Sequence, residues 1–99
     1  MAYTKGTVFG SPLFVLRCYG NDVGVTRWGF AVGKRIAKRA VVRNRTKRRI
    51  REIARGLKVT PGLDLVVVAR APAITADASE LADGLARVLR RAGALVVAE

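Results

Sequence analysis

The sequence contains no histidine and only one cysteine among its 99 residues. Without histidine the chain lacks the commonest general base, the usual zinc ligand and every Ser-His or Cys-His pair. A single cysteine excludes an intrachain disulfide, and the apolar segment around Cys18 indicates a buried, small hydrophobic side chain. No clustered pair of carboxylates replaces the missing histidines, so hydrolysis carried out by the protein's own side chains is not favoured.

Acidic residues are also scarce, since 7 Asp and Glu stand against 19 Lys and Arg, for a formal charge of +12. Such a surplus predicts a polyanionic partner, with nucleic acid ahead of an anionic membrane. No apolar run approaches the roughly 20 residues needed to span a bilayer. The N-terminus also lacks an apolar signal core, so we expect a cytoplasmic protein with no membrane partner. The length and the 51% hydrophobic content predict one domain, residues 1–99, with a small two-layer core.

The densest positive charge lies in Ala40 to Arg55 (AVVRNRTKRRIREIAR), which we predict to be one helix. At 3.6 residues per turn, one side is largely apolar and should pack on a sheet. That side holds Val42, Thr46, Ile50, Ile53 and Leu57. The opposite side holds Asn44, Lys47, Arg48, Arg51 and Arg55, with Arg43 and Arg45 on the flanks. Glu52 is the only acid in the stretch, so most of these cations lack a local partner.

A solvated surface helix is the plainer interpretation of such a charge run. However, solvated helices usually mix Lys with Glu, whereas this face is mostly arginine, whose planar fork pairs with phosphate and stacks on bases. The helix also lacks the Trp, Phe or Leu-rich face expected of membrane insertion. The connector before it (33–39) adds Lys34, Arg35, Lys38 and Arg39 where free helix N–H groups attract phosphate. We therefore predict nucleic-acid contact here, although the connector is not a P-loop.

Strands are expected on both sides of this helix. Residues 13–19 alternate, and Phe14, Leu16 and Cys18 should face the helices. Arg27 to Val32 reads as a second strand, antiparallel to the first across a turn at residues 20–22. Asp64 to Ala69 should be a strand buried on both faces, and therefore central or parallel in the sheet. It should be reached by a βαβ crossover that is right-handed by default. Met1 to Ser11 and Arg70 to Thr75 read as irregular segments.

A second helix should run to about Ala92, started by a capping box at Asp77 and Glu80 and ended by Gly93. The apolar tail after it could pack or fray. The lone tryptophan, Trp28, could anchor the core or offer a stacking surface, and we interpret it as an anchor.

The motif RNRxKRxxRE at residues 43–52, preceded by GFAV and a basic connector, resembles the protein component of bacterial ribonuclease P. SPLFVLR, RWGFAVGKR and LDLVVVARAP also resemble segments of that family, in the same order. The resemblance covers nearly the whole chain from Gly6 onward. A bare RNR would be a weak signal, but the extended motif between these strands is a strong one.

The resemblance implies an α+β fold, a two-layer α/β sandwich similar to a ribosomal-protein domain, with a left-handed βαβ crossover in place of the default hand. It implies Mg²⁺-dependent removal of the 5′ leader from precursor tRNA, with the chemistry carried by an RNA subunit that also holds most of the Mg²⁺. By match to the family, the leader cleft would involve Val15 and Arg17. The residues implied to contact the RNA subunit are Lys34, Arg35, Arg39, Arg43, Asn44, Arg45, Lys47, Arg48 and Arg51.

The chain departs from the family at two places. The family's N-terminal helix, which carries a cleft phenylalanine, is expected to be largely absent, with Tyr3 as its last remnant. Arg17 stands where family members often have an aromatic residue. Two other functions stay open on composition alone. One is a ribosomal or general RNA-binding protein, and the other is a DNA-binding module, which is disfavoured because strands rather than a second helix flank the basic helix.

Overall fold

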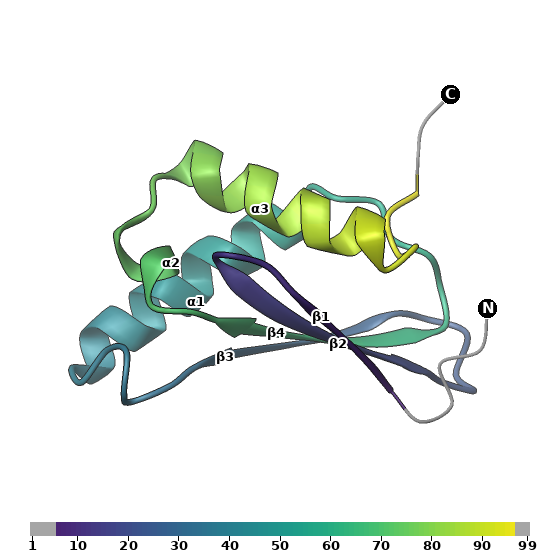
Figure 1. Cartoon of the computed structure of the whole chain (residues 1–99). Helices are drawn as coiled ribbons and strands as arrows, with labels where there is room; N and C mark the ends of the chain where they lie inside the picture. Colours follow the sequence, from purple (N-terminus) through teal and green to yellow (C-terminus); the bar gives the residue numbers. More distant parts are fainter. Residues whose placement is uncertain (1–5, 97–99) are drawn as a thin grey trace.

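The computed structural model describes residues 6–96, which form a four-stranded sheet with helices on one side (Figure 1). Within residues 6–96, the other side of the sheet carries no helix. The elements, in chain order, are β1 (Thr7–Gly10), β2 (Phe14–Gly20), β3 (Arg27–Val32), α1 (Ala40–Arg55), β4 (Leu63–Ala69), α2 (Pro72–Thr75) and α3 (Ala78–Arg91). No helix in the described range is long and apolar enough to cross a membrane.

The strand order is β1-β2-β4-β3, with β2 antiparallel and β3 parallel to β4. The expected antiparallel pairing of residues 27–32 with residues 13–19 is therefore wrong, because β4 lies between these two strands. The segment 21–26 passes the end of β4 instead of making a tight turn. Asn21 fastens it there: its backbone N–H donates to the Gly62 carbonyl, and its side-chain amide donates to the Asp64 carboxylate and the Val25 carbonyl.

Two segments expected to be irregular are regular. Thr7–Gly10 forms the edge strand β1, paired antiparallel with β2. Residues 72–75 form the single turn α2, whose first residue is a proline, a position where the missing N–H costs nothing. Both elements span 4 residues, too short for an apolar period to show in the sequence. Tyr3, and with it the expectation about an N-terminal helix, lies outside the described residues.

The face of the sheet that meets the helices forms the core. Phe14, Leu16 and Cys18 are fully buried, which confirms the predicted orientation of β2. On β4 the buried residues alternate with half-buried ones, so the expectation that β4 is buried on both faces is wrong. The physical reason is that the helices of the described residues all lie on one side of the sheet. The central position of β4 is confirmed, since both of its edges are hydrogen-bonded to neighbours.

The two long helices match their predicted bounds closely. Helix α1 spans the predicted residues and buries Thr46, Ile50 and Ala54, while the Thr46 hydroxyl donates to the Val42 carbonyl at 2.9 Å. Helix α3 starts with the predicted capping box, in which Asp77 and Glu80 exchange hydrogen bonds of 2.8 and 3.1 Å. Since β3 and β4 are parallel and α1 joins them, the predicted βαβ crossover is confirmed. Its left hand stays a prediction from the family resemblance.

Candidate nucleic-acid interface

Helix α1 places its polar side chains on one exposed face, as its sequence predicts. Its apolar stripe is anchored against β3 and α3, and this contact fixes the direction of the opposite side. Its first turn contains no acid, and no side chain caps its N-terminus. One shallow depression is lined by Val41, Asn44, Arg45, Lys47, Arg48 and Arg51. The structure thus brings together five of the nine residues predicted to contact RNA.

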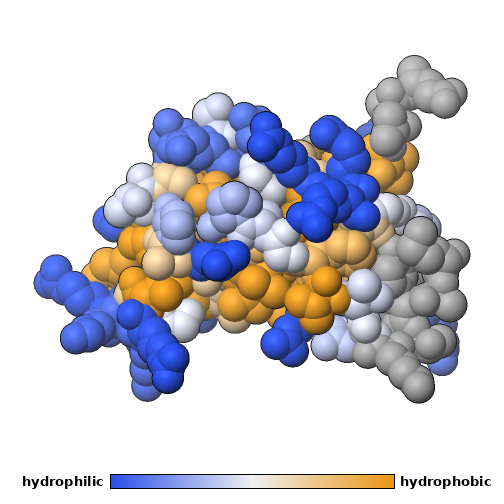
Figure 2. Space-filling model, in the orientation of Figure 1, coloured by the Kyte–Doolittle hydropathy of each residue, from blue (hydrophilic) through white to orange (hydrophobic). Residues whose placement is uncertain are grey.

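The connector before α1 continues this surface. Its backbone folds tightly, since the Gly33 carbonyl accepts from the Ile36 and Ala37 N–H groups at 3.3 Å. Ala37 is buried, so the chain is held at that point while Lys34, Arg35 and Arg39 stay exposed. Figure 2 shows hydrophilic side chains gathered at this end of the molecule. The predicted contact residues of the connector therefore lie beside those of α1.

Arg43 differs from its predicted partners because its side chain is used inside the protein. Its guanidinium Nη1 donates to the carbonyl oxygens of Ala37 at 2.9 Å and Lys38 at 2.7 Å. The side chain thereby fastens the connector to the first turns of α1. The prediction that Arg43 contacts RNA remains, but its observed contacts are with the backbone that carries the neighbouring cations.

Other arginines also brace the fold, a role that sequence reasoning missed. Arg49 donates to the Ala76 carbonyl at 3.0 Å, between α2 and α3. Arg70 donates to the Ser11 carbonyl at 2.9 Å, and Arg91 donates to the Gly10 carbonyl. These contacts tie α3 and the end of β4 to the β1–β2 hairpin. No sequence signal separates such arginines from free ones, because the acceptors are distant backbone carbonyls.

The two residues predicted for a leader cleft lie on the open face of the sheet. Val15 stands opposite Gly10 and Val68, and Arg17 stands opposite Val66 and the highly exposed Val8. This face is thus largely apolar around the exposed guanidinium of Arg17. It points away from the helices, so the structure does not join Val15 and Arg17 to the cations of α1. The two sets occupy opposite sides of one sheet.

One ion pair forms among residues 6–96, between Arg27 on β3 and Asp64 on β4. Arg27 donates to both carboxylate oxygens, at 2.8 and 2.9 Å. These hydrogen bonds, with a further one from Asn21 at 2.9 Å, hold the pKa of the Asp64 carboxyl below its ordinary value. This pair joins two strands and includes no residue of α1, so it leaves the charge of the α1 face uncompensated.

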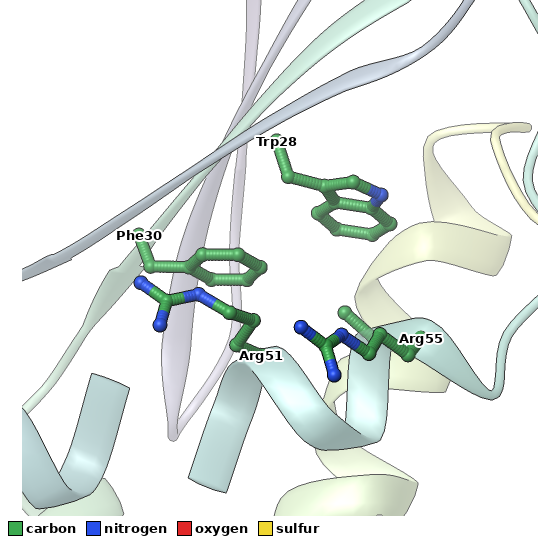
Figure 3. Close-up of a pocket in the computed structure, with 5 residues that line it drawn as sticks. Trp28, Phe30, Arg51 and Arg55 are labelled. Atoms are coloured by element: carbon green, nitrogen blue, oxygen red, sulfur yellow. The ribbon is translucent and has the colours of Figure 1, made fainter. Parts of the chain in front are cut away.

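A second hollow, of ≈ 310 Å³, opens between β3 and the last turns of α1. Trp28 and Phe30 form one wall, with ring centroids 5.6 Å apart and planes 6° from parallel. Arg51 and Arg55 reach into it from the helix (Figure 3), and the Arg51 guanidinium lies 5.8 Å from the Phe30 centroid. Trp28 packs against the core, as predicted, but it is only half-buried. Sequence reasoning missed Phe30 and Arg55 as members of a site.

The side chains available as metal ligands show whether the protein itself could bind a metal ion. Among the described residues, no three His, Cys, Asp or Glu side chains come together where an ion could be held. Mg²⁺ prefers oxygen ligands, usually one or two carboxylates with substrate phosphates. The predicted RNA-contact residues of α1 are cationic or neutral, so they do not fit a Mg²⁺ site.

A family model described as ribonuclease P matches residues 1–93. The chain belongs to the ribonuclease P protein family. Among its relatives, the ribonuclease P protein component of Roseiflexus castenholzii is 40% identical over 91 residues, which covers 89% of this chain and 74% of the relative. That of Clostridium kluyveri is 37% identical over 95 residues, covering 92% and 84%.

Solved ribonuclease P proteins share the fold as well as the sequence. The structure from Thermotoga maritima matches with a TM-score of 0.80 and 28% identity, covering 88% of this chain and 84% of that one. The structure from Staphylococcus aureus matches with a TM-score of 0.76 and 31% identity, covering 91% and 84%. The family and the α+β fold drawn from the RNR motif are therefore confirmed. As a ribonuclease P protein, the chain acts as the protein subunit of that enzyme.

Proposed function

We propose that this ribonuclease P protein binds the catalytic RNA subunit through the α1 face and assists removal of the 5′ leader of precursor tRNA. The observation that carries the proposal is the one-sided charge of α1. The exposed side chains of Arg45, Arg48 and Arg51 share one depression with Lys47, and no carboxylate pairs with them within residues 6–96. Gathering these charges costs repulsion, which phosphate groups would relieve.

The neutral member of this face makes the proposal more specific than charge alone. Asn44 is exposed and lines the same depression as the cations. An amide adds no net attraction to phosphate, but it can both donate and accept a hydrogen bond. Its position between Arg43 and Arg45 suits a shaped contact to a folded RNA, whereas a non-specific polycation needs no amide.

The open face of the sheet is the proposed site for the single-stranded leader. Its apolar side chains, including the half-buried Val15 and Val66 and the exposed Val8, offer contact area to bases. Arg17 supplies one exposed cation in the middle of this area, which would contact the leader backbone. With the RNA subunit on α1 and the leader beneath the sheet, a single domain would touch both partners.

In this proposal the RNA subunit carries the chemistry and holds most of the Mg²⁺, while the protein is its non-catalytic partner. The support on the protein side is the composition of its exposed faces, which offer cations and apolar area. Such faces can position the substrate, and they can neutralise phosphate charges that would otherwise repel one another. A lower Mg²⁺ requirement of the holoenzyme is the expected consequence.

The deciding experiment is single-turnover cleavage of a precursor tRNA at low Mg²⁺, with RNA subunit alone, protein alone and both together. We expect no cleavage by the protein alone and faster leader removal by the RNA when the protein is added. Cleavage by pure protein would refute the division of labour. If the protein binds RNA but leaves the rate unchanged, a general RNA-binding role without processing is the better description.

A further inference from the structure

The hollow between β3 and the end of α1 is lined by Trp28, Phe30, Arg51, Ala54 and Arg55, and we call it the aromatic slot. We propose that the aromatic slot binds one unpaired nucleobase of the RNA together with its phosphate. The proposal rests on the proposed function, because it takes RNA as the partner. It adds a site on the helix side of the sheet, separate from the open face assigned to the leader.

The shape of the slot suits a flat group. The rings of Trp28 and Phe30 are stacked, with centroids 5.6 Å apart and planes only 6° from parallel, so both aromatic rings line the slot in the same orientation. Across from them, α1 presents Ala54, whose small side chain leaves room that a larger residue would fill. Figure 3 shows Arg51 and Arg55 directed from the helix into the space beside the two rings.

The charge of the slot selects among flat ligands. Two of its lining residues are arginines and none is acidic. The single ion pair of residues 6–96 lies elsewhere, so neither guanidinium is neutralised by a carboxylate. A purely apolar ligand would gain nothing from these cations, and a bare anion would gain nothing from the rings. A nucleotide satisfies both, because its base stacks on aromatic side chains while its phosphate pairs with arginine.

The slot is also continuous with the proposed RNA surface. Arg51 lines both the slot and the depression that contains Asn44 and Arg48. A strand that follows phosphate contacts along α1 would therefore reach the slot at the C-terminal half of the helix. An unpaired nucleotide is required there, since a base within a duplex keeps its faces covered by its neighbours. The proposed partner is accordingly a single-stranded or bulged segment of the RNA.

The first test uses Trp28 as its own reporter, because it is the only tryptophan in the sequence. The full chain is titrated with an adenine hexanucleotide, and separately with an abasic strand of the same length and charge. We expect the hexanucleotide to quench the Trp28 fluorescence to saturation and the abasic strand to leave it nearly unchanged. Equal quenching by both strands, or quenching by neither, would overturn the proposal.

The second test uses variants and the affinity for labelled strands. Trp28→Ala should weaken hexanucleotide binding by roughly 5- to 100-fold, the usual range for one stacked base, and spare the abasic strand. If Trp28→Ala fails to fold, the exposed Arg55 still decides. Arg55→Gln should weaken hexanucleotide binding by roughly 2- to 5-fold more than Arg90→Gln, its charge-matched control on α3. Equal effects of these two substitutions would contradict the proposal.

Failure of this inference can be told apart from failure of the proposed function. The same wild-type preparation is assayed for stimulation of leader removal by the RNA subunit. Stimulation without quenching of Trp28 rejects the slot and keeps the proposed function. If the hexanucleotide quenches Trp28 fluorescence but the protein does not stimulate leader removal, the processing role is rejected and the nucleotide site is kept.

Discussion

Replacement of Arg43 by alanine should destabilise the free protein, whereas replacement of Arg45 should not. Both residues belong to the RNR stretch and both substitutions remove one positive charge from the same helix. They differ in what the side chain does. Arg43 donates two hydrogen bonds, of 2.9 and 2.7 Å, to carbonyl oxygens of the connector, whereas Arg45 is exposed and lines the depression.

The magnitude follows from these contacts. A hydrogen bond within a protein contributes about 0.5–1.5 kcal/mol net, so the two bonds of Arg43 contribute about 1–3 kcal/mol. Removal of the charge also relieves repulsion from Arg39 and Lys47, which lie four residues away on each side, by about 0.2–0.5 kcal/mol per pair. With the middle of each range, the net loss for Arg43→Ala is about 1–2 kcal/mol. For a domain of this size, each kcal/mol lowers the Tm by about 4–8 °C.

The measurement is the free energy of unfolding from urea titrations followed by circular dichroism, without RNA. Arg43→Ala should lose about 1–2 kcal/mol, while Arg45→Ala should stay within about 0.5 kcal/mol of the wild type. Arg43→Lys adds a control, because it keeps the charge on a shorter side chain that reaches the two carbonyls less well, so it should still be less stable. Equal stability of Arg43→Ala and Arg45→Ala would show that the connector is held by other contacts and that the reasoning is wrong.

Two further outcomes are expected. Asn44→Ala should weaken binding to the RNA subunit by about 1–3 kcal/mol and leave the salt dependence of binding nearly unchanged, whereas Arg90→Ala should cost under about 1 kcal/mol. The measurement is the binding constant of each variant at two salt concentrations. A larger effect of Arg90→Ala would show that the RNA binds a face other than that of α1. Because hydrogen bonds from Arg27 and Asn21 lower the pKa of Asp64, its contribution to stability is full above the unfolded pKa of about 4 and is lost as pH falls through the folded value. The difference in unfolding free energy between wild type and Asp64→Asn should therefore shrink on acidification from about pH 5 to about pH 2, and a constant difference would contradict this linkage.

Features set by contacts within a few residues could be predicted from the sequence. The bounds of α1 follow from its period, and the start of α3 follows from the reciprocal hydrogen bonds of Asp77 and Glu80. The clustering of Asn44 with Arg48 and Arg51 follows from helical geometry alone. For the same reason the sequence located the main part of the candidate interface.

Features set by distant partners could not be predicted in this way. The insertion of β4 between β2 and β3 depends on pairings across more than thirty residues, for which a single sequence carries no signal. Arg43 and Arg49 resemble their free neighbours in the sequence, but they differ because backbone carbonyls happen to lie within reach. The aromatic slot likewise exists only because the crossover places Arg55 across from Trp28.

The position of β4 also decides when the cationic face acquires its shape. Helix α1 is synthesised before β4, yet β3, on which it packs, has no strand partner until residues 63–69 have left the ribosome. A nascent chain that ends before residue 63 already carries every cation of α1, but not the central strand that orients them. If α1 binds RNA as proposed, we expect such a chain to bind it as a flexible polycation whose cations hold no fixed arrangement. We therefore expect selectivity between RNAs to require β4 in the centre of the sheet, and a chain truncated before residue 63 should keep affinity for RNA but lose selectivity.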